Sequence, residues 1–171
     1  MDKKMGSELP ANLYQYFKEN TMTGVASTMD EDGFPRGAPM SMFYAVDEKT
    51  ILMAVQNGSA TFRNARDHGL IALTFISAGD KAFTIQAGVK VFKEKMENSK
   101  YIGILCLELH NVKSNVADDV EVKEGIKLAF RSQRWKELIC QILAELRSYH
   151  RGPKGDLIQG EPGVSSIEVE P

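Results

Sequence analysis

The stretch that decides the fold reads GVASTM over Gly24–Met29 and continues with DEDGFP over residues 30–35. The first six residues are typical of a β-strand, and the Asp32-Gly33 step in the second six is a strong signal for a tight turn. A second β-prone run, residues 36–46, follows directly. The stretch therefore predicts a β-hairpin, from which the other elements can be placed.

Four further strands are predicted after this hairpin, at residues 50–55, 70–76, 82–93 and 103–110. Short connections join several of them, so neighbouring strands should run antiparallel. A helix should precede the hairpin, because Leu9, Leu13 and Phe17 recur on one helical face. The predicted fold class is mainly β with helices (α+β), with a six-stranded antiparallel sheet that is large enough to close into a barrel.

The C-terminal part of the chain is predicted to be helical over residues 117–150, with Ser132 as the cap of its last helix. An apolar stripe at helical spacing supports this prediction, and it consists of Trp135, Leu138, Ile139, Ile142, Leu143 and Leu146. Residues 154–171 are rich in Gly, Pro, Ser and Glu without an apolar period, which predicts a flexible tail. We expect one domain over residues 1–153, followed by this tail.

Composition excludes several classes of function for the 171-residue chain. Hydrophobic residues make up 43% and charged residues 26%, as in an ordinary globular protein. A net charge of −2 and a pI of about 6.0 provide no basic surface for nucleic acid. The sequence contains no apolar segment long enough for a signal peptide or a membrane span, so we expect a cytoplasmic protein.

The residues that most often carry metal or nucleophilic chemistry are isolated from one another in the sequence. Cys106 and Cys140 form no CxxC pair, and the histidines, His68, His110 and His150, are far apart. No GxSxG motif occurs, so acyl-transfer chemistry has no support. We therefore predict no metal site, and no catalytic acid or base can be assigned.

An ordered set of motifs remains to be explained. Residues 36–41 (RGAPMS) follow the hairpin turn, and residues 58–64 (GSATFRN) follow the buried third strand and begin a short helix that ends at Gly69. In this order and spacing, residues 9 to 95 resemble the pyridoxamine 5'-phosphate oxidase-like family of FMN-binding split barrels. The resemblance implies a split β-barrel, FMN as cofactor, and a homodimer that holds its cofactors in clefts between the subunits.

The resemblance also implies which residues bind FMN. The second strand would follow the flavin ring and ribityl chain, the end of the third strand would continue that contact, and the start of the short helix would hold the phosphate. A helix N-terminus suits this role because its backbone N–H groups and positive dipole end attract anions. Arg36 or Arg63 would add positive charge. The cofactor-binding residues implied are Arg36, Pro39, Met40, Ser41, Met42, Val55, Gln56, Asn57, Ser59, Thr61 and Asn64.

The chain also departs from the true pyridoxamine phosphate oxidases. Those enzymes carry a Lys where Ser41 stands and an Arg-Lys pair where Ala60-Thr61 stands, so the phosphate site here is less cationic. Their C-terminal Arg and His substrate motif has no counterpart in this chain. The sequence is therefore more similar to the broad branch of flavin-nucleotide-binding proteins, and vitamin B6 oxidation is not expected.

Structural roles compete with these functional ones. Ser59 and Thr61 are common helix caps, Arg36 and Arg63 are equally typical of solvated surface, and Met40 and Met42 suit a core better than a flavin face.

Two functions remain open at this stage. The first is an FMN-dependent oxidoreductase that passes hydride or electrons from a nicotinamide or similar donor to a small acceptor. The second is a binding, storage or sensor protein of the same fold, which holds a flavin or haem without turnover. A barrel that has lost its ligand and serves only as an interaction module is a weaker third possibility.

Overall fold

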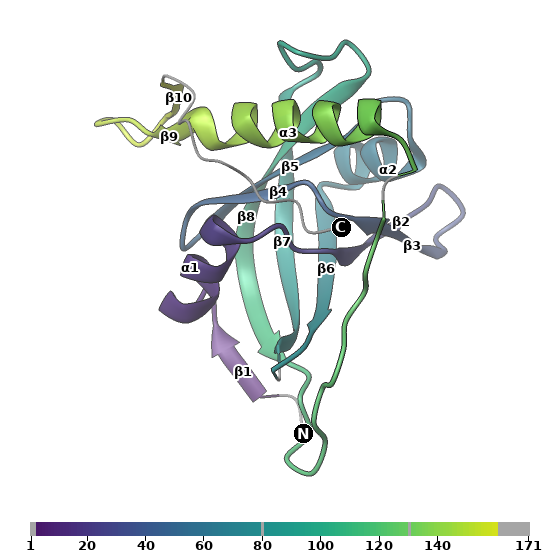
Figure 1. Ribbon diagram of the computed structural model, residues 1–171, viewed down its shortest axis with the longest axis vertical. Helices are drawn as coiled ribbons and strands as arrows, with labels where there is room; N and C mark the ends of the chain where they lie inside the picture. The colour runs from purple at the N-terminus through teal and green to yellow at the C-terminus, as the bar shows by residue number, and fades with distance from the viewer. Residues whose placement is uncertain (1–2, 80, 130, 161–171) are drawn as a thin grey trace.

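The computed structural model describes residues 3–79, 81–129 and 131–160. Within these residues the chain is mainly β with three helices (Figure 1). The helices are α1 (Ala11–Glu19), α2 (Ala60–His68) and α3 (Gln133–Ser148). The strands are β1 (Lys3–Gly6), β2 (Gly24–Met29), β3 (Pro35–Met40), β4 (Phe43–Asp47), β5 (Thr50–Gln56), β6 (Leu70–Ser77), β7 (Lys81–Lys93), β8 (Ile102–Ser114), β9 (Tyr149–Arg151) and β10 (Leu157–Gln159). No helix among the described residues is long and apolar enough to cross a bilayer.

The hairpin predicted from the sequence is confirmed as β2 and β3, which pair antiparallel from Gly24–Met40 to Met29–Pro35. Its turn is held by Asp30, whose carboxylate accepts hydrogen bonds from the backbone N–H groups of Asp32 and Phe34 at 3.1 and 2.8 Å. Gly33 takes a φ of 82°, a conformation that favours glycine. Local chemistry alone therefore accounts for this turn.

The hairpin belongs to one antiparallel sheet of eight strands, with the order β3-β2-β6-β7-β8-β5-β4 and with β1 paired to β8. The prediction of a single strand over residues 36–46 is wrong, because the run divides into β3 and β4, and these stand at opposite ends of the strand order. This division and the additional strand β1 raise the predicted six strands to eight. The order has two ends, so the pairing does not show closure into a barrel.

The link between β3 and β4 controls the shape of the sheet. Only Ser41 and Met42 separate the two strands. Three Cα–Cα steps span at most about 11 Å, so the opposite edges of the sheet must approach each other at this corner. The sheet is therefore strongly curled.

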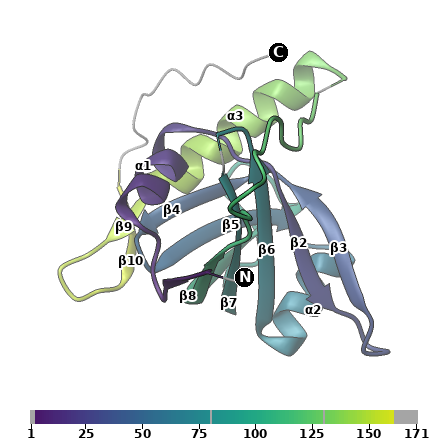
Figure 2. The ribbon, with the colours of Figure 1, turned by 90° about the horizontal axis from the view of Figure 1, so that it is seen from below.

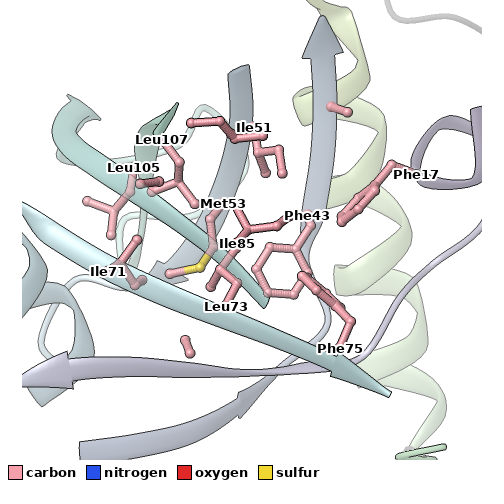
Figure 3. Close-up of a cluster of buried hydrophobic side chains, with 14 of the residues drawn as sticks. Phe17, Phe43, Ile51, Met53, Ile71, Leu73, Phe75, Ile85, Leu105 and Leu107 are labelled. Atoms are coloured by element: carbon pink, nitrogen blue, oxygen red, sulfur yellow. The ribbon is translucent and has the colours of Figure 1, made fainter. Parts of the chain in front are cut away.

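The concave side of the sheet encloses the larger core (Figure 3). Phe75 lies at its centre, with the rings of Phe17 from α1 and Phe43 from β4 each 5.2 Å away in edge-to-face contact. Leu13 and Phe17 are the buried residues of α1, four positions apart as the sequence predicted. The N-terminal helix thus covers the open side of this core.

A second core lies on the other face of β5 and β8, under α3, which crosses β4 and β5 (Figure 1). Strand β5 is buried on both faces, because Ile51 and Met53 enter the first core while Leu52 and Ala54 enter the second. The predicted apolar stripe supplies the helix side of this core with Ile139, Ile142, Leu143 and Leu146. Trp135, at 48% exposure, stays outside it.

The prediction of helices from residue 117 is wrong for the first part of that segment. Residues 117–129 form no helix, and α3 begins at Gln133 behind the predicted cap Ser132. The reason is long-range hydrogen bonding: Val122 O accepts from Gly79 N, and Ile126 N donates to Ile76 O, both at 3.3 Å. The backbone of this segment is bonded to the end of β6 and the turn after it.

Part of the segment predicted to be a flexible tail forms a strand. Residues 157–159 form β10, which pairs with β9. Arg151 of β9 anchors this hairpin through a 2.8 Å ion pair with Asp47, a 2.6 Å hydrogen bond to Thr50 Oγ1 and a 2.7 Å hydrogen bond to Gly155 O. The rest of the predicted tail, residues 161–171, lies outside the described residues.

Replacing Gly103 by Ala should destabilise the fold by about 1–3 kcal/mol, as overpacking of a core does. A Cβ at this position in β8 would lie 2.7 Å from the Phe62 ring of α2 and 3.0 Å from Lys93 O. Chemical denaturation of the variant would measure the loss. The matched control is Gly58→Ala, since a Cβ there meets nothing within 4 Å. Equal stability of the two variants would contradict the packing argument.

Candidate functional site

The residues predicted to bind FMN fall into three segments of the structure. The first is β3 with the link that follows it, the second is the end of β5 with its turn, and the third is α2 with its cap. The segments contain, in that order, Arg36, Pro39, Met40, Ser41 and Met42; Val55, Gln56 and Asn57; and Ser59, Thr61 and Asn64. Helix α2 packs beside the β2–β3 hairpin (Figure 2), so the first and third segments are neighbours.

Thr28 is a neighbour of both Arg36 and Asn64. It pairs directly with Arg36 across β2 and β3, so the two side chains share one face of the sheet. The Asn64 amide donates a 3.2 Å hydrogen bond to Thr28 Oγ1. Thr28 is buried and was not among the predicted site residues. Arg36 of the first segment and Asn64 of the third segment thus lie next to the same residue of β2.

Arg36 itself is held by the hairpin turn. Its Nε lies 2.9 Å from Asp30 Oδ2, and its side chain is 64% exposed. Hydrogen bonds from the Arg36 guanidinium and the Phe34 N–H lower the pKa of the Asp30 carboxyl below its ordinary value. Arg36 therefore has a local partner, while its exposure leaves the cation accessible to an anion.

The start of α2 has the chemistry expected of an anion site. Ser59 is the N-cap, and its Oγ accepts a 3.2 Å hydrogen bond from the N–H of Phe62. Arg63 Nη1 donates a 2.6 Å hydrogen bond to Gly58 O, which keeps that cation beside the helix start. A serine hydroxyl that accepts one hydrogen bond retains a proton to donate. The capping role and a phosphate contact are thus compatible at Ser59.

The outer edge of β3 is short of hydrogen-bond donors. The backbone N–H of Asp30 donates to Phe34 O at 2.9 Å, so these two residues form a hydrogen-bonded pair at the turn end of the β2–β3 ladder. Along an antiparallel ladder, hydrogen-bonded pairs alternate with pairs that are not bonded to each other. By this alternation, the backbone groups of Pro35, Gly37 and Pro39 point away from β2. Proline has no N–H, so this part of the edge offers three carbonyl groups and a single N–H, that of Gly37.

Asn57 is held by the connection between β7 and β8. Its side-chain amide donates to the carbonyl oxygens of Glu94 and Lys100, both at 3.0 Å, and its backbone N–H donates to Tyr101 O at 3.0 Å. Residues 94–101 were not predicted to take part in the site. They fix the turn that leads from β5 into α2.

Several predicted site residues have buried or half-buried side chains. Val55 is fully buried in the first core, Thr61 is a buried residue of α2, and Met40 is half-buried and packs against the first core. Met42 is half-buried and packs against the second core, so both methionines make packing contacts with a core. Gln56 is exposed at the end of β5.

A pocket of about 600 Å³ lies elsewhere in the molecule. It is formed by the start of α1, the turn between β4 and β5, and Arg151 of β9, and none of the predicted site residues lines it. Arg151 is already bonded to Asp47, Thr50 and Gly155. No group of three or more His, Cys, Asp or Glu suited to a metal ion was found among the described residues.

Comparison with known proteins gives the family. The family model for pyridoxamine 5'-phosphate oxidase matches residues 12–124, which is more than half of the chain. No curated protein matches.

Similar solved structures include a protein from Lactobacillus delbrueckii described as a pyridoxamine 5'-phosphate oxidase, with 19% identity and a TM-score of 0.53 over 64% of this chain and 98% of that one. HupZ of Group A Streptococcus has 12% identity and a TM-score of 0.51 over 70% and 100% of the two chains. An FMN-binding protein from Syntrophomonas wolfei has 12% identity and a TM-score of 0.49 over 62% and 84%. On the strength of the family match, this chain belongs to the pyridoxamine 5'-phosphate oxidase-like FMN-binding split-barrel family.

Proposed function

We propose that this protein is an FMN-binding flavoprotein that acts as an oxidoreductase between a nicotinamide or similar donor and a small acceptor. The observation that carries the proposal is the hydrogen bond from Asn64 to Thr28. It joins α2 to the strand pair that bears Arg36, which supports a cofactor site built from this helix and this strand pair in a member of the family.

The phosphate of FMN would lie at the start of α2. Ser59 would donate its hydroxyl proton, the first N–H groups of the helix would add further donors, and Arg63 or Arg36 would supply positive charge. Thr61 is buried, so its contribution would come through its backbone N–H. This set of groups fits a phosphate without the additional cations of the true oxidases.

The flavin ring would lie along the outer edge of β3. Flavins carry acceptor atoms on one side of the ring, and Gly37 has the N–H on this part of the edge that can donate to them. When bound, FMN supplies the capacity to accept and release hydride or electrons. The role of the chain is then to bind and orient the cofactor and its substrate.

A second copy of the chain would complete the site. Pro35, Arg36, Gly37 and Pro39 are all exposed, whereas small-molecule sites commonly bury most of the surface of their ligand. An open strand edge cannot do this alone. We therefore propose a homodimer in which the partner covers the flavin held at β3.

A non-catalytic flavin- or haem-binding protein is the second candidate. It is compatible with the composition of the predicted cofactor-binding residues, among which Arg36 is the sole ionisable side chain. Such a site offers no general acid or base. Binding and storage need none, and neither does hydride transfer to a flavin, so turnover must be measured.

The purified protein should show the absorption bands of oxidised flavin and should release a compound with the mass of FMN on heating. Anaerobic NADH or NADPH should bleach these bands, and a small acceptor should restore them. Flavin that is bound but inert to both donors would favour the non-catalytic candidate. A colourless protein that also refuses added FMN would contradict both candidates.

Replacing Ser59 by Ala should weaken FMN binding by roughly 10- to 150-fold, because a hydrogen bond to a charged group contributes about 1.5–3 kcal/mol. The variant also loses a helix cap, at about 1 kcal/mol of folding stability. Ser132→Ala is the matched control, since Ser132 caps α3 in the same way by accepting from Trp135 N. Fluorescence titration should show a loss of affinity for the first variant alone. Equal affinity in both would place the phosphate elsewhere.

Replacing Gly37 by Pro should weaken flavin binding by about tenfold, because it removes the N–H between Pro35 and Pro39. Proline is tolerated at the outer positions of an edge strand, so the fold should persist. Gly37→Ala is the control: it keeps the N–H and adds a Cβ 3.1 Å from Val25 Cγ1. Flavin affinity and the position of the flavin bands would be compared. An alanine variant as weak as the proline variant would exclude the role of the N–H.

A further inference from the structure

Glu145 is a buried carboxylate in α3, only 5% exposed, and it lies outside residues 12–124 that the family model covers. It accepts hydrogen bonds from the backbone N–H of Glu97 at 3.1 Å and from the backbone N–H and side-chain amide of Asn98, both at 3.3 Å. The Tyr149 hydroxyl donates a fourth at 3.4 Å. The C-terminal helix is therefore pinned to the connection between β7 and β8.

A charge in this position calls for an explanation. Burial of a carboxylate is unfavourable unless hydrogen bonds compensate it, and the neighbouring inward positions of α3, Ile142 and Leu146, are apolar. An apolar residue would pack there without that penalty. Unlike an apolar residue, Glu145 holds the backbone N–H groups of Glu97 and Asn98 in place. It holds them firmly, because hydrogen bonds to a charged acceptor are stronger than those between neutral groups.

The connection that Glu145 holds reaches the start of α2 on its other side. Glu94 O and Lys100 O both accept from the Asn57 amide, and Tyr101 O accepts from Asn57 N. Asn57 lies two residues before the cap Ser59. Two sets of hydrogen bonds, one from Glu145 and one from Asn57, thus hold the same connection, and the backbone of residues 94–101 joins them.

We propose that Glu145 is a positioning residue for the phosphate site at the start of α2, acting through residues 94–101 and Asn57; this inference rests on the proposed function. The carboxylate sets the backbone of Glu97 and Asn98, and their connection fixes the carbonyl pair that holds Asn57. The C-terminal helix would then increase the affinity for the cofactor without contacting the cofactor itself.

The test is the preference for FMN over riboflavin, which has the same ring but no phosphate. Glu145→Gln replaces one acceptor oxygen by an NH₂ group that opposes an N–H donor of the connection. It should lower the FMN-to-riboflavin affinity ratio about tenfold and should speed hydrogen exchange at the amides of Glu97 and Asn98. Ser148→Ala is the matched control, because Ser148 is buried in the same helix and donates within it to Glu145 O. It should leave the ratio unchanged.

The double variant Glu145→Gln with Asn57→Ala should show little further loss of the ratio beyond Asn57→Ala alone, since both act on one series of contacts. An unchanged ratio in Glu145→Gln, or equal losses for FMN and riboflavin, would overturn the inference. If Glu145→Gln does not fold, Asn57→Ala tests the same link from its exposed end, and an unchanged ratio there would also overturn it. A wild-type protein that binds neither flavin would instead refute the proposed function.

Discussion

Two residues, Ser41 and Met42, connect strands that stand at opposite ends of the sheet. The chain can satisfy this constraint only if the sheet curls until its edges approach. The curl creates a concave side that encloses the aromatic core around Phe75 and a convex side on which α3 packs. It also leaves β3 as an outer edge beside α2, so the geometry of the candidate site depends on the same short link.

The parts of the fold that local chemistry determines could be predicted. The β2–β3 hairpin followed from its Asp-Gly turn, and the apolar stripe of α3 was typical of a helix packed on one face. The break at Ser41–Met42 could not be predicted, because β-prone residues continue through it without a turn signal. Nor could the non-helical path of residues 117–129, since its cause is bonding to Gly79 and Ile76, far away in the sequence.

The candidate site divides in the same way. The cap Ser59 and the exposed cation Arg36 were recognisable from residue type and spacing. Burial of Val55 and Thr61 depends on packing that no local pattern reveals, and the role of residues 94–101 rests on backbone carbonyl groups, which every residue possesses. The structure adds that the side-chain amide of Asn57, a predicted cofactor contact, donates to two of those carbonyl groups.

The alternation of prolines along β3 has a consequence for assembly. An exposed strand edge is a template on which another strand can add, and long rows of unpaired N–H and C=O groups promote aggregation. Pro35 and Pro39 lack two of the N–H donors that such an addition requires. Both lie in β3, which is the strand at one end of the sheet order. The sheet is thereby protected from growing by strand addition at this edge, so any association of copies at β3 has to be made by side chains rather than by continuous backbone pairing.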